Sequence, residues 1–184
     1  STLFPYTTLF RSVKLAYDKV ARCLGMNYPG GPEVERLAKL GNDEAIDFPR
    51  VMLDKNSYNF SFSGLKTAVL NYLNSKKQKN EEISKEDVCA SFQRAVFDVL
   101  IYKTEKLMKE KDLKNLVVSG GVSANNTLRS EIEKMCEKNN FKSYFPDKIL
   151  CTDNAAMIAS SGYYEYISGV RSDLTLNVEP NLEL

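Results

Sequence analysis

The chain has 184 residues, of which 43% are hydrophobic, so it is long and apolar enough to form one or two domains with a substantial core. Its 25 basic and 24 acidic residues leave a net charge of +1, which excludes a bulk electrostatic case for nucleic-acid or membrane binding and makes any nucleic-acid contact a local one. The absence of histidine excludes a Ser-His-Asp triad and a histidine-based metal site built from this chain alone.

The cysteines lie singly in the sequence, without a C-x-x-C pair, at Cys23, Cys89, Cys136 and Cys151. Scattered cysteines are typical of reduced thiols in a cytoplasmic protein. No apolar run approaches the roughly 20 residues that a membrane-spanning helix needs, so we expect no membrane association.

The first stretch of the chain, residues 1–12, is unlike the rest of the sequence. It repeats Thr-Leu-Phe and shows no helical period. We therefore interpret it as an extraneous or disordered leader and leave it out of the fold argument, with an edge strand as the alternative.

The sequence after this stretch predicts two helices joined by a rigid turn. The first helix ends at Gly25 and has an apolar face formed by Leu15, Tyr17, Val20, Ala21 and Leu24. The turn covers residues 28–32, where Pro32 is placed to open the second helix. That helix is expected to run to about residue 40 and to stop at Gly41.

Asp18 lies on the first predicted helix, ahead of the Pro-Gly-Gly-Pro bend. An acid on a helix and a turn of small residues can converge on one polar ligand. The alternative interpretation is a solvated acid beside an ordinary turn.

Residues 42–62 show no clear periodicity and predict a loop with one or two short strands. A helix follows, capped by Ser61 or Ser63, and its apolar face is formed by Leu65, Val69, Leu70 and Leu73. We interpret Phe60 and Phe62 as core residues, with base stacking as the alternative.

The next part of the chain predicts a helix–strand–helix–strand order. Residues 75–85 form a charged linker, and Ser84 caps a long packing helix that ends at about residue 111. A buried strand at residues 116–119, a helix at 126–138 and a short strand at 141–145 follow. This order is typical of an α/β fold with the first of these strands at its centre.

Two glycines, Gly120 and Gly121, connect the first of these strands to the helix. A strand that ends in small residues before a helix N-terminus can bind a nucleotide or an anion, because the backbone is accessible and its N–H groups are free. The alternative is a purely structural turn, since glycine is common wherever the backbone must adopt positive φ.

The last distinctive segment, residues 150–159, is a polar cluster before an alanine-rich helix. Thr152 or Asp153 caps this helix in the simplest interpretation. In the functional interpretation Asp153 is a metal ligand, although one carboxylate does not make a site.

Five motifs occur in the order and spacing of one family: DKVAR at residues 18–22, YPGGP at 28–32, FSFSGLKT at 60–67, SGGVSAN at 119–125 and CTDNAAM at 151–157. On these motifs the chain resembles the TsaD family, formerly named Gcp, of tRNA threonylcarbamoyladenosine transferases. The similarity runs from about residue 16 to residue 184 and corresponds to the C-terminal half of a family member.

This resemblance implies an α/β fold of the actin/Hsp70-like (ASKHA) ATPase type, of which the chain supplies part of the two lobes. It implies transfer of a threonylcarbamoyl group from threonylcarbamoyl-AMP to N6 of adenosine 37, in tRNAs that read ANN codons. The family acts with the partner proteins TsaB and TsaE. An interaction or nucleotide-binding lobe of the actin/Hsp70 type, without catalysis, is the alternative.

By position, the resemblance assigns Asp18 and Glu35 to the ribose or adenine side of the acyl-adenylate. It assigns Gly31 and Asn125 to the same ligand, through the backbone and the side-chain amide. It makes the Gly120–Gly121 turn one wall of the acyl-adenylate site. No catalytic residue is assigned.

Asp153 would bind the family's divalent metal, iron or zinc, whose Lewis acidity polarises the carbamoyl carbonyl. The family's other two metal ligands are histidines of an H-x-x-x-H helix in its N-terminal lobe, where its first glycine-rich phosphate loop also lies. This chain contains neither. We therefore expect it to bind metal poorly and to be inactive alone.

The family has Gly-Glu where this chain has Lys14 and Leu15. The match therefore breaks at about Ala16. We expect residues 1–15 to be a non-native or disordered leader and residues 16–184 to be the TsaD-like part.

Overall fold

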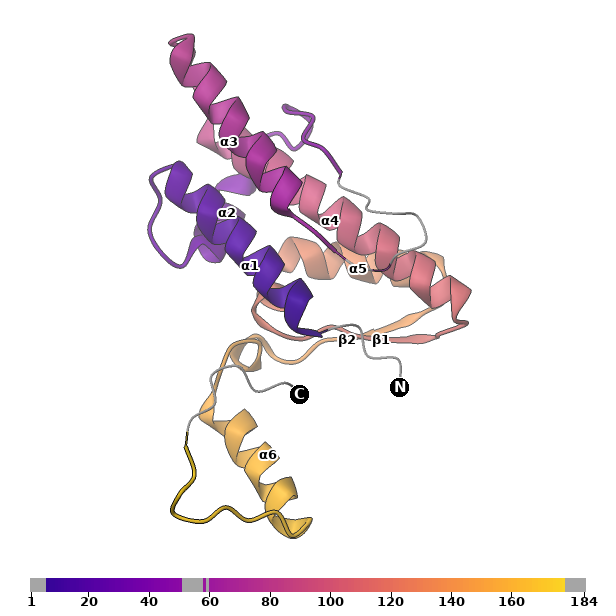
Figure 1. The fold of residues 1–184 in the computed structure, drawn as a ribbon. Helices are drawn as coiled ribbons and strands as arrows, with labels where there is room; N and C mark the ends of the chain where they lie inside the picture. The colour runs from indigo at the N-terminus through magenta and orange to yellow at the C-terminus, as the bar shows by residue number, and fades with distance from the viewer. Residues whose placement is uncertain (1–5, 51–57, 59, 178–184) are drawn as a thin grey trace. The chain divides into compact units, whose positions relative to one another are not determined.

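The computed structural model describes residues 6–50, 58 and 60–177. The chain divides into two compact units, Ser1–Cys151 (unit 1) and Thr152–Leu184 (unit 2). Unit 1 contains five of the six α-helices found in the described part of the chain and a small parallel sheet (Figure 1).

The first helix of unit 1, α1 (Tyr6–Cys23), begins earlier than the sequence predicts. Residues 6–12 are helical, so the alternative of an edge strand there is wrong. The predicted end is confirmed, because Gly25 has φ +72°, a conformation that favours glycine. Leu15 is 58% exposed and does not belong to the apolar face, whereas the other four residues predicted for that face are buried.

The second helix, α2 (Gly30–Ala38), follows a cis peptide bond between Tyr28 and Pro29. It starts two residues before Pro32, which therefore lies in its first turn. Proline is tolerated there because the N–H groups of a first turn make no hydrogen bond within the helix. The helix ends at Ala38, slightly earlier than predicted. Gly41 is still required nearby, because a Cβ there would lie 2.2 Å from the carbonyl oxygen of Glu86.

The loop that follows contains no strand in the described residues 42–50, 58 and 60–62, so the predicted short strands are not found there. The remaining part of the predicted loop lies outside the described residues. Phe62 is 1% exposed, which confirms its interpretation as a core residue. Phe60 is half-buried and packs against the same core.

Helix α3 (Ser63–Gln78) differs from the prediction at both ends. Its N-cap residue is Phe62, without a side-chain cap, so neither Ser61 nor Ser63 caps it. The helix extends into the predicted linker, where Lys76 pairs with Glu81 just beyond the helix end. Basic residues in a last turn interact favourably with the helix dipole, which helps to extend α3.

The long helix α4 (Lys85–Glu110) is the centre of unit 1, and α2, α3 and α5 pack against it. Its predicted cap is confirmed, because Ser84 Oγ accepts a hydrogen bond from Asp87 N at 3.1 Å. Apolar residues recur along it at three- and four-residue steps, and six of them are buried, namely Val88, Phe92, Ala95, Val96, Val99 and Leu107. Burying each large apolar side chain contributes on the order of 1.5–3 kcal/mol.

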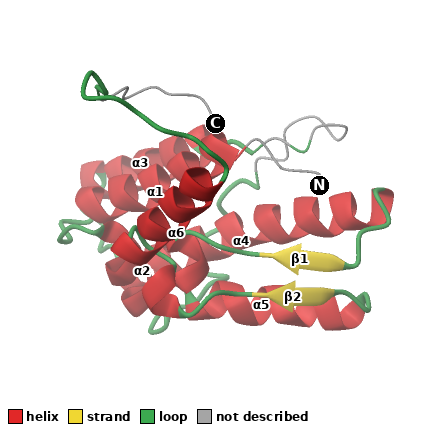
Figure 2. Cartoon of the chain, turned by 90° about the horizontal axis from the view of Figure 1, so that it is seen from below, coloured by secondary structure: helices red, strands yellow, loops and turns green. Residues whose placement is uncertain are grey.

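The sheet consists of β1 (Asn115–Val117) and β2 (Lys142–Tyr144), which are parallel, with Leu116 opposite Ser143. Helices α4 and α5 (Asn126–Lys138) lie on one face of it (Figures 1 and 2). The helix and the second strand confirm the prediction. The expected buried central strand is wrong: β1 has three residues, and Val117 is 72% exposed.

The described part of the chain is therefore mostly helical, with a small parallel sheet. This agrees with the α/β class in its coarse form. The actin/Hsp70-like architecture remains a prediction from the resemblance.

Unit 2 contains helix α6 (Ala155–Ile167). Its N-cap is Asn154, whose Oδ1 accepts from Met157 N at 3.0 Å, so the predicted cap at Thr152 or Asp153 is wrong. In the ranges that the structure describes, no helix combines the length and hydropathy needed to cross a membrane.

The Cys89 thiol makes stability depend on pH. Burial, with a further contribution from the charge of Glu86, raises the pKa of Cys89 from 9.0 to about 12. The folded thiol therefore keeps a proton that the unfolded thiol loses, and the free energy of unfolding should fall between pH 9 and pH 12. Urea unfolding across this range should show a shallower fall for Cys89→Ala than for the unchanged chain. Cys23→Ala, at a half-buried thiol, is the control, and equal slopes for Cys89→Ala and the unchanged chain would contradict the assignment.

Candidate functional site

Asp18 contacts the predicted turn directly. Its Oδ1 accepts a hydrogen bond from Gly30 N, the first residue of α2, at 2.9 Å. The carboxylate thus satisfies one of the N–H groups that a helix start leaves unpaired, and its charge is favourable at that end. The sequence interpretation of an acid converging on the turn is correct in geometry, and the partner is the protein's own backbone.

The two glycines of the turn have different surroundings. A Cβ on Gly30 would lie 2.8 Å from the Cα of Asp18 and 2.8 Å from the Cβ of Ala21. A Cβ on Gly31 would meet no neighbouring atom within 4 Å. Close packing of α1 against α2 therefore requires Gly30, whereas the backbone at Gly31 faces open space into which a ligand can enter.

Tyr17, beside Asp18 in the sequence, is buried, and its ring contacts the ring of Phe92 in α4 edge-on, with 5.1 Å between the centroids. Its hydroxyl is the one buried side-chain polar atom in the described part of the chain without a hydrogen-bond partner. Burial, followed by the charge of Glu35, raises the pKa of Tyr17 above its ordinary value. The phenol therefore stays protonated, and Tyr17 is unsuited to accept or release a proton near neutral pH.

Glu35 connects α2 to the start of α5. Its Oε1 accepts from the backbone N and the side-chain Nδ2 of Asn126, each at 3.1 Å, and lies 3.1 Å from Lys39 Nζ. A carboxylate at a helix N-terminus is electrostatically favourable. Glu35 thus links α2, which follows the turn between α1 and α2, to Asn126 at the start of α5.

The glycine pair forms a tight turn. Gly120 has φ +85°, which L side chains rarely adopt, and its carbonyl oxygen accepts from Ser123 N at 2.9 Å and Ser123 Oγ at 2.7 Å. A short 3₁₀ helix, η1 (Gly121–Ala124), follows. Gly121 is exposed, with open space where a side chain would stand. The structure therefore explains Gly120 by backbone geometry and leaves the backbone accessible at Gly121.

Asn125 uses both ends of its side-chain amide within the protein. Its Oδ1 accepts from Leu128 N at 3.0 Å and caps α5, and its Nδ2 donates to Gln93 Oε1 at 2.9 Å. The side chain is 8% exposed. Sequence reasoning missed Gln93, whose signal was a polar residue within the buried stripe of α4.

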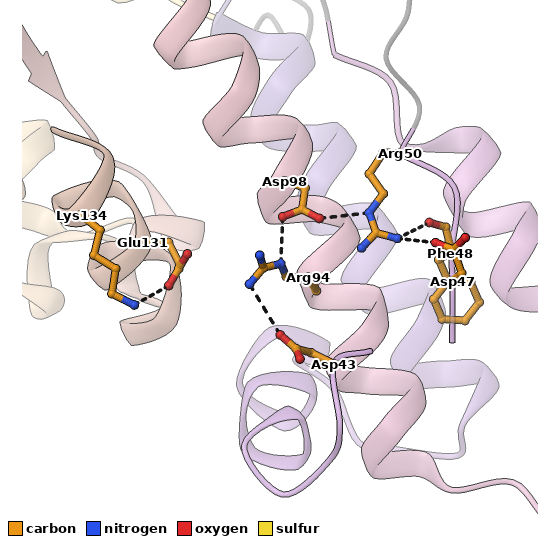
Figure 3. Close-up of polar contacts among 8 residues, drawn as sticks. All are labelled: Asp43, Asp47, Phe48, Arg50, Arg94, Asp98, Glu131 and Lys134. Atoms are coloured by element: carbon orange, nitrogen blue, oxygen red, sulfur yellow. Dashed lines mark hydrogen bonds and ion pairs between the residues drawn. The ribbon is translucent and has the colours of Figure 1, made fainter. Parts of the chain in front are cut away.

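A pocket of about 270 Å³ lies beside Gln93, lined by residues of α2, α4 and α5. Its rim carries an ion-pair network, shown in Figure 3: Asp98 accepts from Arg94 Nε at 2.9 Å and from Arg50 Nε at 3.0 Å. Asp43 lies 3.7 Å from Arg94 Nη1. Partly exposed pairs of this kind contribute about 0–1 kcal/mol each. The rim is a structural network, and none of the predicted site residues lines the pocket.

Asp153 belongs to unit 2, and its side chain is exposed. No group of three histidine, cysteine, aspartate or glutamate side chains in the described ranges could hold a metal ion. The single carboxylate of Asp153 does not by itself complete a site for iron or zinc.

Comparison with known proteins decides the family. The family model described as TsaD, tRNA N6-adenosine threonylcarbamoyltransferase, matches residues 6–160. This chain belongs to the TsaD family. The match covers the regions of Asp18, Gly31, Glu35, the glycine pair, Asn125 and Asp153. Its start at residue 6 lies within the stretch interpreted as a leader, which stays a prediction.

Over the aligned region, about half of the residues are identical between this chain and relatives in the TsaD family. A protein of Clostridioides difficile (strain 630) is 52% identical over 169 residues, which are 92% of this chain and 50% of the relative. Proteins of Clostridium botulinum (strain Hall) and Clostridium beijerinckii are 51% and 50% identical over the same shares. All three are named tRNA N6-adenosine threonylcarbamoyltransferase. The chain matches their C-terminal half and spans about half their length.

The two glycines of the TsaD-type turn should respond differently to the same substitution. Gly30→Ala places a methyl group against backbone and side-chain atoms of α1 and should lower the free energy of unfolding by about 1–3 kcal/mol. Gly31→Ala meets no neighbour and should leave it within about 1 kcal/mol of the unchanged value. Urea unfolding measures both. Equal losses for the two variants would show that Gly30 is not the packing contact.

Proposed function

We propose that this chain forms the C-terminal part of a transferase that moves a threonylcarbamoyl group from threonylcarbamoyl-AMP to N6 of adenosine 37, in tRNAs that read ANN codons. The observation that carries the proposal is the family match over residues 6–160. Because the chain spans half the length of its relatives, the activity belongs to the chain completed by the half that precedes the match in those relatives.

The two carboxylates of the proposed site are suited to bind the nucleoside. Asp18 Oδ1 accepts from Gly30 N, and Glu35 Oε1 accepts from Asn126 N and pairs with Lys39 Nζ. A carboxylate has a second oxygen with its own lone pairs. We assign Asp18 Oδ2 and Glu35 Oε2 to hydroxyl or amino groups of the acyl-adenylate. The hydrogen bonds to the first oxygen of each carboxylate hold the second oxygen in position.

The backbone of the two turns is suited to the rest of the ligand. Gly31 and Gly121 each leave open space, so a ligand can approach the main chain there. We assign the Gly120–Gly121 turn to the phosphate side of the acyl-adenylate and Gly31 to its nucleoside. Asn125 holds α5 and the turn in place through Oδ1 and one N–H, and we assign the second N–H of its amide to the same ligand.

In the proposed reaction, N6 of the adenine attacks the carbamoyl carbonyl carbon. A C–N bond forms, the bond from that carbon to the AMP phosphate oxygen breaks, AMP leaves with the bonding electron pair, and N6 releases a proton. The residues of this chain bind and orient the acyl-adenylate for that attack. The divalent metal of the family, iron or zinc, and the partners TsaB and TsaE belong to the proposal for the complete protein, in which Asp153 supplies one metal ligand.

A transfer assay tests the proposed function. The chain alone should form no threonylcarbamoyladenosine in an ANN-reading tRNA, and the chain fused behind the preceding half of the Clostridioides difficile relative should form it, as measured by mass spectrometry of nucleosides. In the fusion, Asp18→Asn keeps an oxygen for Gly30 and removes the second one. It should raise the KM for threonylcarbamoyl-AMP by about 10–100-fold.

Asp98→Asn, in the ion-pair network of the pocket rim, is the matched control and should leave the KM unchanged. A fusion that folds and binds the acyl-adenylate without transferring would favour the non-catalytic lobe. Transfer by the 184-residue chain alone would overturn the requirement for the other half.

A further inference from the structure

Cys151, the last residue of unit 1, lies in a polar environment that is unusual for a buried thiol. It is 3% exposed, and its Sγ lies 3.2 Å from Ser123 Oγ and 3.2 Å from Arg129 Nη2. The carbonyl oxygen of Asp147 is 3.5 Å away. A buried cysteine commonly behaves as a small hydrophobic residue. Here the sulfur accepts from Arg129, and the Ser123 hydroxyl and the Asp147 carbonyl oxygen lie close enough to interact with it.

Arg129 is the cation of this cluster, and its position opposes the helix dipole. It lies in the first turns of α5, where the helix end is partially positive. None of the ion pairs in the described part of the chain includes Arg129. Its guanidinium instead donates to Ser123 O at 2.5 Å, to Pro146 O at 2.8 Å and to Cys151 Sγ. These contacts offset an electrostatically unfavourable placement.

The shape of the guanidinium makes these contacts possible. Its rigid, planar set of N–H groups reaches three acceptors from three segments of the chain, and its face lies 5.0 Å from the ring centre of Phe145. A lysine ammonium is a point charge on a flexible stem and cannot reproduce this arrangement. The cluster is therefore specific for arginine.

Ser123 connects this cluster to the glycine turn. Its hydroxyl lies 2.7 Å from the carbonyl oxygen of Gly120, and its backbone carbonyl accepts from Arg129. Arg129 thus donates hydrogen bonds both to Ser123, which follows the glycine turn, and to Cys151. Cys151 is the residue from which the chain continues to Thr152 and Asp153.

We infer that Arg129 is a positioning residue, which holds Cys151 against the glycine turn and so fixes the point where the Thr152–Asp153 segment leaves unit 1. The anchoring is a property of this chain alone. Its importance for catalysis rests on the proposed function, which assigns the glycine turn to the acyl-adenylate.

Alkylation of the thiols tests the anchoring on the 184-residue chain. Arg129→Ala should raise the rate at which iodoacetamide labels Cys151 by at least about tenfold, because local opening exposes the sulfur. Arg129→Lys should give nearly the same increase. Cys136, a buried thiol of α5, is the internal reference and should keep its rate. Arg94→Ala, which removes an arginine from the pocket rim, is the control variant and should leave Cys151 unlabelled on the same time scale.

A second measurement separates positioning from general stability. The NMR order parameter of the residue 151 amide should be near 0.85 in the unchanged chain and below about 0.6 in Arg129→Ala. Cys151→Ser keeps a hydrogen-bonding atom and should preserve the order, whereas Cys151→Val should lose it. An order parameter that stays high in Arg129→Ala, with a lower melting temperature, would assign Arg129 a purely stabilising role and overturn the inference.

Neither measurement requires transfer activity. A failure of the anchoring would leave the transfer assay intact, and a failure of the transfer assay would leave the anchoring intact. The two proposals are therefore tested independently.

Discussion

The hydrogen bond between Asn125 and Gln93 joins the glycine turn to the central helix. Both side chains are buried, at 8% and 5% exposed, and the bond from Nδ2 to Oε1 is 2.9 Å long. A buried amide left without a partner costs about 1–3 kcal/mol, so this pairing strongly favours one arrangement of the two elements. Asn125 also caps α5 through Oδ1. One side chain therefore sets both the start of α5 and the distance of the turn from α4.

The proposed binding site follows from this constraint. With the start of α5 fixed on α4, Glu35 of α2 can bind the N-terminus of α5. Asp18 of α1 binds the N-terminus of α2 through a separate contact. Each carboxylate is held by one oxygen. The second oxygens and the open backbone at Gly31 and Gly121 are polar groups of unit 1 that are suited to bind a nucleotide. Under the proposed function these groups share one ligand, the acyl-adenylate, and the rest of the site would come from the half that this chain does not match in its relatives.

Sequence periodicity correctly predicted the helices for which the capping residues and the buried apolar stripe indicate the same boundaries. The start of α4 at Ser84 and the full extent of α5 are confirmed, because capping side chains and buried stripes agree there. The burial of β1 was not predictable, since an apolar strand becomes buried only if both faces of its sheet are covered, and that depends on distant segments. Gln93 was missed because its partner lies 32 positions away. The family motifs indicated the candidate site, and its ligand contacts remain predictions.

The central claim is that the Asn125–Gln93 bond fixes the turn, and a double-mutant cycle tests it most directly. Asn125→Ser keeps a capping oxygen for α5 and removes the amide donor, and Gln93→Leu removes the acceptor. The two changes should be coupled by about 1–2 kcal/mol in the free energy of unfolding, with the double variant losing less than the sum of the two single losses. Additivity within about 0.3 kcal/mol would contradict it, since the two side chains would then contribute independently.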